Sequence, residues 1–393
     1  MKKKILAVVL SCLLAFGTFG LIACVSNEAK FQVDVFIYNR IDEYGDELAK
    51  EIVKQVGAKA QVNIHDGETF DDADGKQAQQ IENVLNSGTD LIIAALADYS
   101  IAERVAQQAQ AKGVQVIFSI REPYTESNAN ALENFDNTSF VGIQNDVAGI
   151  LQGQLVAKYL TEGRYRVEEG TTVNYIQFRG DNGNPAADAR SKNVIEQANL
   201  LLSEKNITLN PIEADSGTNV DNTSIDVAWN GDFGDTSARG RLEAILNSRG
   251  VGLASKEEND NINMIIGNSD DIAIGAITAL QTKDWNKGNL DKTIPVFCMD
   301  ALTNGKQYVK DGMLTATLEA DLSFNAKILT QMINNVINGA KVAKDTIKDL
   351  DQLTDSTKPG NTVIMGGKVG NKTLENIIGL DYFPYSGNLS TTK

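Results

Sequence analysis

Histidine and cysteine are nearly absent from this chain of 393 residues, and their scarcity excludes several kinds of site. His65 is the only histidine, so a site that needs several histidines for a metal is impossible. We expect this residue in a surface turn beside Asp66, not in a catalytic triad. Two of the three cysteines lie within the first 24 residues, which leaves Cys298 as a predicted core thiol and excludes an intrachain disulfide. Walker loops, nucleophile elbows and Cys-x-x-Cys motifs are missing as well, so we expect neither an enzyme nor a cofactor.

Basic side chains are also in short supply. The 36 lysines and arginines are outnumbered by 52 aspartates and glutamates, and the formal net charge is −16. Three of the lysines lie in an N-terminal segment that we expect to be removed, so the mature chain is more acidic still. Such a surface repels phosphate backbones, and we predict no nucleic-acid partner.

The longest apolar run, residues 5–19, is too short to span a bilayer, which takes about 20 residues. It follows lysines at positions 2–4, as in a secretory signal, and ends in residues 21–24 (LIAC). These four residues resemble the lipobox of bacterial lipoproteins. The resemblance implies a signal peptide at 1–23, a lipid on Cys24, a tether at 24–30 and a place on the extracytoplasmic face of the cell membrane. An ordinary cleaved signal with an incidental cysteine is the alternative.

Beyond residue 30 the chain alternates between short apolar runs and amphipathic segments. Strand-like runs occupy residues 33–38, 90–96, 114–120, 173–178, 262–266 and 294–299. Between them, apolar residues recur at helical spacing, as at positions 48, 52, 53 and 56. A second such helix, with apolar positions 78, 81, 84 and 85, is expected to stop at Gly88. The pattern predicts an α/β protein with parallel sheets covered on both faces, and the length favours two domains. Ligands bind such sheets at the carboxyl ends of the strands, so polar residues that follow strands are site candidates.

Several of these strand ends carry motifs of a known family. The motifs are residues 36–38 (FIY) with 42–44 (DEY), 121–123 (REP), 180–185 (GDNGNP) with 189–190 (AR), 267–270 (GNSD) with 273–276 (AIGA), and 296–302 (VFCMDAL). From about residue 31 to 339 the chain resembles the periplasmic galactose/glucose-binding protein family, the type I solute receptors of sugar transport systems.

The resemblance implies an architecture and a function. The fold would be two Rossmann-like domains hinged around a central cleft, the type I periplasmic-binding-protein fold. The N-terminal lobe would hold residues 31–142 plus about 322–345, and the C-terminal lobe residues 143–321 plus about 346–393. A monomer would capture a monosaccharide, glucose or galactose first of all, and deliver it to an ABC permease and its ATPase.

The resemblance also implies site residues. Arg190 would form a fork to two sugar oxygens, and Asp300 would accept from two hydroxyls; a structural ion pair is the alternative for both. Asp42 would accept from a ring hydroxyl or cap a helix, and Tyr44 would stack on the sugar or belong to the core or hinge. A second stacking aromatic is either Trp229 or Phe233. The remaining candidates are polar residues at matching positions: Arg121, Asn184 and Ser269.

Departures from the family weaken the case for one particular sugar. Ile120 and Ser269 stand where the family has asparagines, Ala186 replaces an aspartate and Ala320 another asparagine. A pentose, a deoxysugar or a furanose-like signal would suit the less polar rim. The family's calcium loop falls on positions with an arginine and a glycine, Arg166 and Gly170, in place of carboxylates, so we predict no metal.

Other roles stay open at this stage. A chemosensory receptor would have the same sequence features as a transport receptor, and a lipoprotein enzyme or adhesin with a secondary ligand pocket is a further alternative. A transcriptional regulator of this fold would need a DNA-binding domain where the leader lies.

Overall fold

The computed structural model describes most of the chain beyond residue 29: residues 30–68, 74–121, 123, 132, 135–143, 145–180, 184–212, 223–228, 234–257, 260–320, 322–342, 362–365 and 380–384. Among these residues, none of the helices combines the length and apolarity that a bilayer crossing requires. The expected signal peptide, the tether and Cys24 lie outside them.

The first lobe is built on a six-stranded sheet in the order β12-β5-β4-β3-β1-β2, and every neighbouring pair is parallel. Its strands are β1 (Gln32–Ile37), β2 (Gln61–Asp66), β3 (Leu91–Ala94), β4 (Gln115–Ser119), β5 (Thr138–Ile143) and β12 (Thr362–Met365). In the described part of the chain four helices cover it: α2 (Glu43–Val56), α3 (Lys76–Ser87), α4 (Ala102–Ala111) and α10 (Leu322–Ile337).

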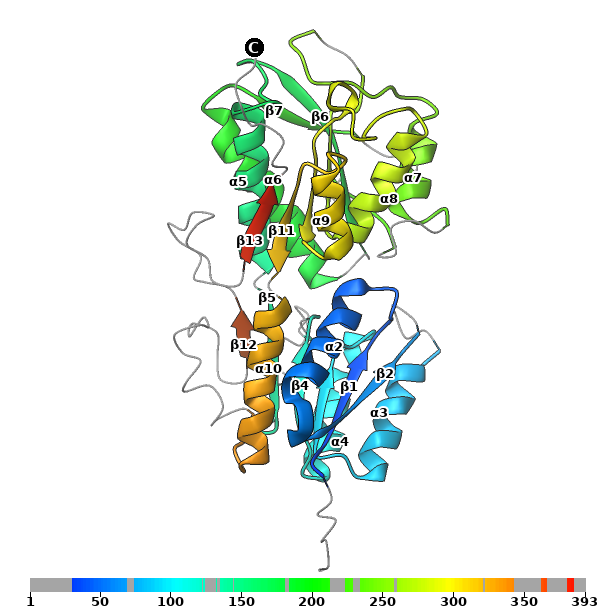
Figure 1. Cartoon of the computed structure of the whole chain (residues 1–393), viewed down its shortest axis with the longest axis vertical. Helices are drawn as coiled ribbons and strands as arrows, with labels where there is room; N and C mark the ends of the chain where they lie inside the picture. The colour runs from blue at the N-terminus through cyan, green and yellow to red at the C-terminus, as the bar shows by residue number, and fades with distance from the viewer. Residues whose placement is uncertain are drawn as a thin grey trace, which may run out of the picture.

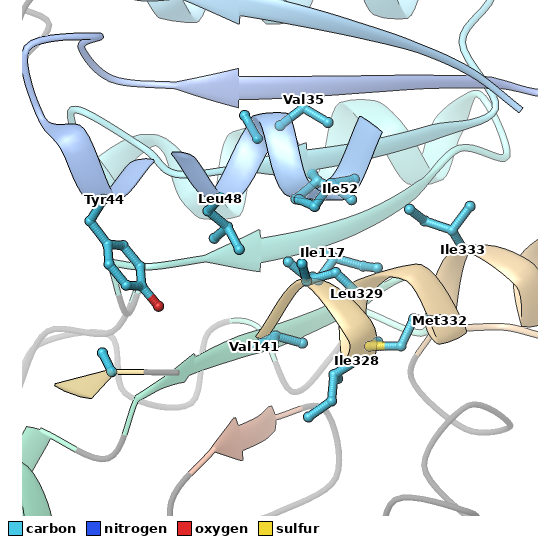
Figure 2. Close-up of a cluster of buried hydrophobic side chains, with 14 of the residues drawn as sticks. Val35, Tyr44, Leu48, Ile52, Ile117, Val141, Ile328, Leu329, Met332 and Ile333 are labelled. Atoms are coloured by element: carbon cyan, nitrogen blue, oxygen red, sulfur yellow. The ribbon is translucent and has the colours of Figure 1, made fainter. Parts of the chain in front are cut away.

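These helices divide between the two faces of the first sheet. One core cluster joins β1 side chains such as Val35 to α2 and α10, and Figure 2 shows Leu48 and Ile52 of α2 facing Leu329 of α10. A second cluster joins Phe36, on the opposite face of β1, to α3 and α4. The alternation of neighbouring β1 residues between two apolar layers explains why this strand reads as a continuous apolar run.

The second lobe has a seven-stranded sheet in the order β13-β11-β10-β9-β6-β7, with β8 paired to β6. Its strands are β6 (Thr172–Gly180), β7 (Thr208–Pro211), β8 (Ile225–Asp226), β9 (Met264–Gly267), β10 (Val296–Asp300), β11 (Ala316–Ala320) and β13 (Leu380–Pro384). All pair in parallel except β13, which runs antiparallel to β11. This arrangement confirms the predicted fold class of two parallel α/β domains.

Among the described residues, five helices cover the second sheet, again on both faces. They are α5 (Asn145–Thr161), α6 (Pro185–Ser203), α7 (Ala238–Ile245), α8 (Asp270–Gln281) and α9 (Thr303–Lys310). Side chains of α5 and α6 form one apolar layer, and those of α7, α8 and α9 form the other. Short 3₁₀ turns at Gly57–Lys59, Tyr99–Ile101 and Leu290–Lys292 complete the described helical segments.

The chain crosses between the lobes more than once. It leaves the first sheet after β5 and returns to it after β11. There α10 packs beside strands that precede it by about 200 residues. Figure 1 shows α10 as the orange helix among blue and cyan elements. The predicted assignment of residues 346–393 to the C-terminal lobe fails at β12, which pairs with β5 of the first sheet. Pairing with β12 gives β5, otherwise an edge strand, a second neighbour.

Two further sequence expectations need correction, and one is confirmed. His65 lies in strand β2, not in a turn, and its Nε2 is 2.7 Å from Asp34 Oδ1. Val53 was placed on the apolar face of its helix, but it is 40% exposed because the buried stripe of α2 runs through Leu48 and Ile52. Cys298 is fully buried, as predicted.

Candidate ligand-binding cleft

A cleft lies between the lobes, where the carboxyl ends of strands from both sheets meet. It encloses about 610 Å³, its open mouth included. The first lobe lines it with Tyr38, Asp42, Tyr44, Leu48, Ser119, Ile120, Arg121, Val141, Gly142, Ile143 and Asn325, and the second with Asn184, Ala186, Arg190, Ser269 and Asp300. Seven of the nine predicted ligand-binding residues are in this set; Trp229 and Phe233 lie outside the described residues.

Arg190 and Asp300 occupy the second-lobe side of the cleft. Arg190 on α6 is held by two hydrogen bonds, from Nε to Asn145 Oδ1 (2.8 Å) and from Nη1 to the Asn268 carbonyl (3.0 Å). Its Nη2 has no partner among the described residues. Asp300, at the end of β10, is only 8% exposed, and its carboxylate has no hydrogen bond to a described side chain or backbone group. Burial raises its pKa well above the ordinary value, although the charge of Arg190 opposes the shift.

The two side chains do not form an ion pair with each other, although both are described. A structural ion pair was the alternative to a ligand-binding role. Their unused hydrogen-bonding capacity, a guanidinium nitrogen and a buried carboxylate, therefore faces the cleft and is available to a polar ligand.

The close packing of α5 on α6 positions Arg190. A Cβ atom at Gly149 would lie 2.6 Å from the Arg190 carbonyl oxygen, and one at Gly153 would lie 2.6 Å from the Val194 carbonyl oxygen. Only glycine permits this approach of the two backbones. The buried side-chain amide of Asn268 connects the β9–α8 turn to α6, because its Nδ2 donates to the Ala187 carbonyl and to Ser191 Oγ.

Asp42 and its neighbours form a network on the first-lobe side. The Asp42 carboxylate is the N-cap of α2, accepting at Oδ2 from the Gly45 N–H (3.0 Å) and from the Tyr38 hydroxyl (2.5 Å). Arg121 lies with its guanidinium carbon 4.0 Å from the centroid of the Tyr38 ring and donates from Nη1 to the Ala97 carbonyl. The capping alternative for Asp42 is thus the observed geometry, and the carboxylate also lines the cleft. Burial raises its pKa.

Tyr44 combines a core position with a place in the cleft wall. It is 6% exposed, and Figure 2 shows its ring hanging from the first turn of α2 on the same side as Leu48 and Ile52. Its hydroxyl accepts a hydrogen bond from Nδ2 of Asn325, near the start of α10. Sequence reasoning missed Asn325. It lies just beyond the end of β11, where the rule that polar residues following a strand are site candidates would have indicated it.

Asn184 and Ser269 are helix caps that face the cleft. Asn184 Oδ1 accepts from the backbone N–H groups of Ala186 (3.0 Å) and Ala187 (3.4 Å) at the start of α6. Ser269 Oγ accepts from the Ile272 N–H (3.2 Å) at the start of α8. Both caps keep donors, the Asn184 amide hydrogens and the Ser269 hydroxyl hydrogen, for a further acceptor.

Acidic residues of the two lobes also come together next to Asp42, at a contact of α2 with α8 and α9. Asn304 Nδ2 on α9 donates to the Glu43 carboxylate on α2, so a hydrogen bond joins the lobes there. Asp271, in the first turn of α8, lies near the same point. Burial, followed by the charges of Glu43, Asp42 and Asp270, raises the pKa of Asp271 to about 8.

Comparison with known proteins fits this two-lobed cleft. The family described as "Periplasmic binding protein domain" matches residues 33–341. The chain belongs to that family. Members of the family are binding proteins, and the prediction of a solute receptor is confirmed at that level.

Individual relatives are distant. The chain is 24% identical over 347 residues to the D-galactose/methyl-galactoside binding periplasmic protein MglB of Haemophilus influenzae, covering 88% of this chain and 92% of that protein. Among solved structures, an ABC transporter solute binding protein from Clostridium phytofermentans with bound β-D-glucose has a TM-score of 0.62 and 18% identity, covering 85% of this chain and 90% of that one. A periplasmic solute binding protein from Actinobacillus succinogenes with bound D-allose has a TM-score of 0.61 and 18% identity, covering 91% and 98%. These structural likenesses show the shared fold.

Proposed function

We propose that this periplasmic binding protein captures a monosaccharide in the cleft between its lobes and delivers it to an ABC importer. The observation that carries the proposal is the pair of Arg190 on α6 and Asp300 at the end of β10, which face one cavity and keep charged hydrogen-bonding capacity unused. A sugar presents adjacent hydroxyl groups that both donate and accept, so a guanidinium nitrogen and a carboxylate together match it. The sugars named for the relatives support the same class of ligand.

Closure of the lobes is the second part of the proposal. Asp42 and Tyr44 belong to the first lobe, whereas Arg190 and Asp300 belong to the second. A ligand that contacts both sets stabilises the closed arrangement over the open one, and the permease would recognise that arrangement. The lipid on Cys24 would hold the receptor, as a monomer, on the extracytoplasmic face of the membrane next to the permease and its ATPase.

Calorimetric titration of the purified mature chain tests this function. D-glucose, D-galactose, D-allose, pentoses and deoxyhexoses are titrated separately, with an amino acid as an unrelated control. We expect saturable one-to-one binding of at least one sugar, with no product released on long incubation. If none of the sugars binds, the assignment is refuted. Turnover of a bound sugar would favour an enzyme instead.

A further inference from the structure

We infer that the preferred ligand is an amphipathic monosaccharide, a deoxyhexose in which a methyl or methylene group facing the first lobe replaces a hydroxyl. The inference rests on the proposed function and narrows its substrate class. Its basis is a group of aliphatic side chains on the first-lobe wall of the cleft, opposite the mostly polar lining of the second lobe.

Several polar groups on the first-lobe side are partly engaged within the protein. The Tyr38 hydroxyl donates to Asp42, and the same carboxylate oxygen also accepts from the helix backbone. The Tyr44 hydroxyl accepts from Asn325, and Arg121 donates to the Ala97 carbonyl while its guanidinium lies over an aromatic ring. The Tyr44 hydroxyl hydrogen and the second carboxylate oxygen of Asp42 stay polar, so an apolar group of the ligand has to lie against another part of this wall.

The rest of that wall is aliphatic. Leu48, Ile120, Val141 and Ile143 line the cleft from three different elements of the first lobe. A ligand hydroxyl pressed against these side chains would lose its water without gaining a partner, whereas a methyl or methylene group would gain contact area.

Ile120 contributes to this wall from a strained backbone conformation. Its φ is +65°, in the left-handed region that a β-branched residue rarely adopts. The residue lies directly after β4 and packs against Tyr38, Ala95 and Ala97. Asparagine would tolerate this backbone conformation better, so Ile120 lines the cleft with an aliphatic side chain despite the strain.

The second-lobe side has the opposite character. Its lining residues keep a guanidinium nitrogen on Arg190, the carboxylate of Asp300, amide hydrogens on Asn184 and a hydroxyl hydrogen on Ser269. These groups suit a ligand edge with several adjacent hydroxyls. One polyol edge and one apolar edge on the same small ring describe a deoxy sugar better than a fully hydroxylated hexose.

Matched sugar pairs test the inference. Each pair differs by one hydroxyl: D-galactose with D-fucose, D-glucose with 6-deoxy-D-glucose, D-glucose with 2-deoxy-D-glucose, and L-mannose with L-rhamnose. Calorimetry on the mature chain should show the deoxy member of at least one pair binding about 10- to 100-fold more tightly than its parent, the range expected for one group in an apolar pocket. Ile120→Asn should reduce that ratio at least several-fold and should not lower the melting temperature.

Leu200→Asn is the matched control, because Leu200 is 65% exposed on α6 and does not line the cleft. It should leave the ratio unchanged. Parent sugars that bind as tightly as, or more tightly than, every deoxy partner would overturn the deoxyhexose inference and leave the proposed function standing. If neither member of any pair binds, the deoxyhexose inference fails, and the proposed function fails with it only if D-allose and the pentoses do not bind either. A deoxy preference that persists unchanged in Ile120→Asn would mean that the aliphatic wall is not its cause, and the inference would fail.

Discussion

Replacing Asp300 by asparagine should move ligand affinity and protein stability in opposite directions. The side chain keeps its size, and asparagine tolerates the φ of +107° at this position, so the turn after β10 should persist. What changes is the charge. The carboxylate is buried without a hydrogen bond to a described residue, and its pKa is raised well above the ordinary value by that burial.

The expected loss of affinity follows from the hydrogen bonds that the carboxylate would accept. A hydrogen bond to a charged group contributes about 1.5–3 kcal/mol, against about 0.5–1.5 kcal/mol for a neutral pair. If the hydrogen bonds from two ligand hydroxyls are weakened in this way, the binding free energy falls by about 1.5–3 kcal/mol in total, which raises Kd about 10- to 150-fold. Calorimetry with the best-binding sugar measures this directly.

The ligand-free protein should respond with higher stability. Because the pKa of Asp300 is higher in the folded than in the unfolded chain, the ionised group destabilises the fold at any pH above its unfolded pKa, and increasingly so as pH rises toward the folded pKa. Asp300→Asn should therefore melt a few degrees higher at pH 8, at about 2–4 °C per kcal/mol for a lobe of this size, and the difference should shrink toward pH 4.

Asp284→Asn is the control, because Asp284 is an exposed surface carboxylate paired with Lys287. It should change neither affinity nor melting temperature appreciably. Unchanged affinity in a folded Asp300→Asn protein would mean that the carboxylate does not contact the ligand. A lower melting temperature at pH 8 would show that the buried charge is stabilised by something other than solvent or ligand.

Further expectations concern the packing of α5 on α6, the contact between the lobes at Glu43, and the expected absence of a bound metal. Gly149→Ala should lower the melting temperature, measured by circular dichroism, and weaken sugar binding, measured by calorimetry, because its Cβ would press on the backbone of Arg190. Gly57→Ala, with open space around the Cβ, should affect stability but not affinity. Burial and the carboxylates of Glu43 and Asp42, which belong to the other lobe, raise the pKa of Asp271 to about 8. Closure therefore takes up a proton, and affinity should fall as pH rises toward about 8 and level off above it; Glu43→Gln should flatten that profile, and an unchanged profile would contradict the assignment. EDTA should shift the melting temperature by no more than about a degree or two, and a large drop restored by calcium would show a metal site that we do not expect.

The sequence predicted the parts of the fold whose strands are buried on both faces. Such strands form continuous apolar runs, as β1, β3 and β10 do, and their period and spacing determine the fold class. Strand β2 gave no such signal because it is an edge strand whose residues are only partly buried, with polar Gln61, Asn63 and His65 on one side. An edge strand needs apolar residues on only part of its surface, so its sequence resembles a turn or loop.

The structure places most of the predicted site residues in the cleft, but their contacts could not be predicted from the sequence. Asp42 illustrates the limit. Its position ahead of a helix predicted both a cap and a ligand contact, and only the structure shows that the cap and Tyr38 already use its Oδ2. Asn325 follows β11 and could have been named as a candidate by its position, but its hydrogen bond to Tyr44, which precedes it by 281 residues, could not. Neither local period nor spacing carries information about such a pair.

Backbone strain connects the two sides of the cleft in a way that bears on ligand binding. Ile120 in the first lobe and Asp300 with Ala301 in the second all have positive φ values, and Ile120 and Asp300 line the cleft directly. Non-glycine residues in such conformations typically cost about 1–3 kcal/mol each, and they persist where surrounding contacts determine them. Here the surroundings are identifiable: the Asp270 carboxylate accepts from the Leu302 N–H and from the Thr317 hydroxyl, and so fixes the turn after β10. The fold thus holds an aliphatic side chain and a carboxylate without a described hydrogen-bond partner toward the same cavity. Because contacts within the protein hold these conformations, a ligand that satisfies both groups does not have to induce either one, and its binding free energy can go into closing the lobes.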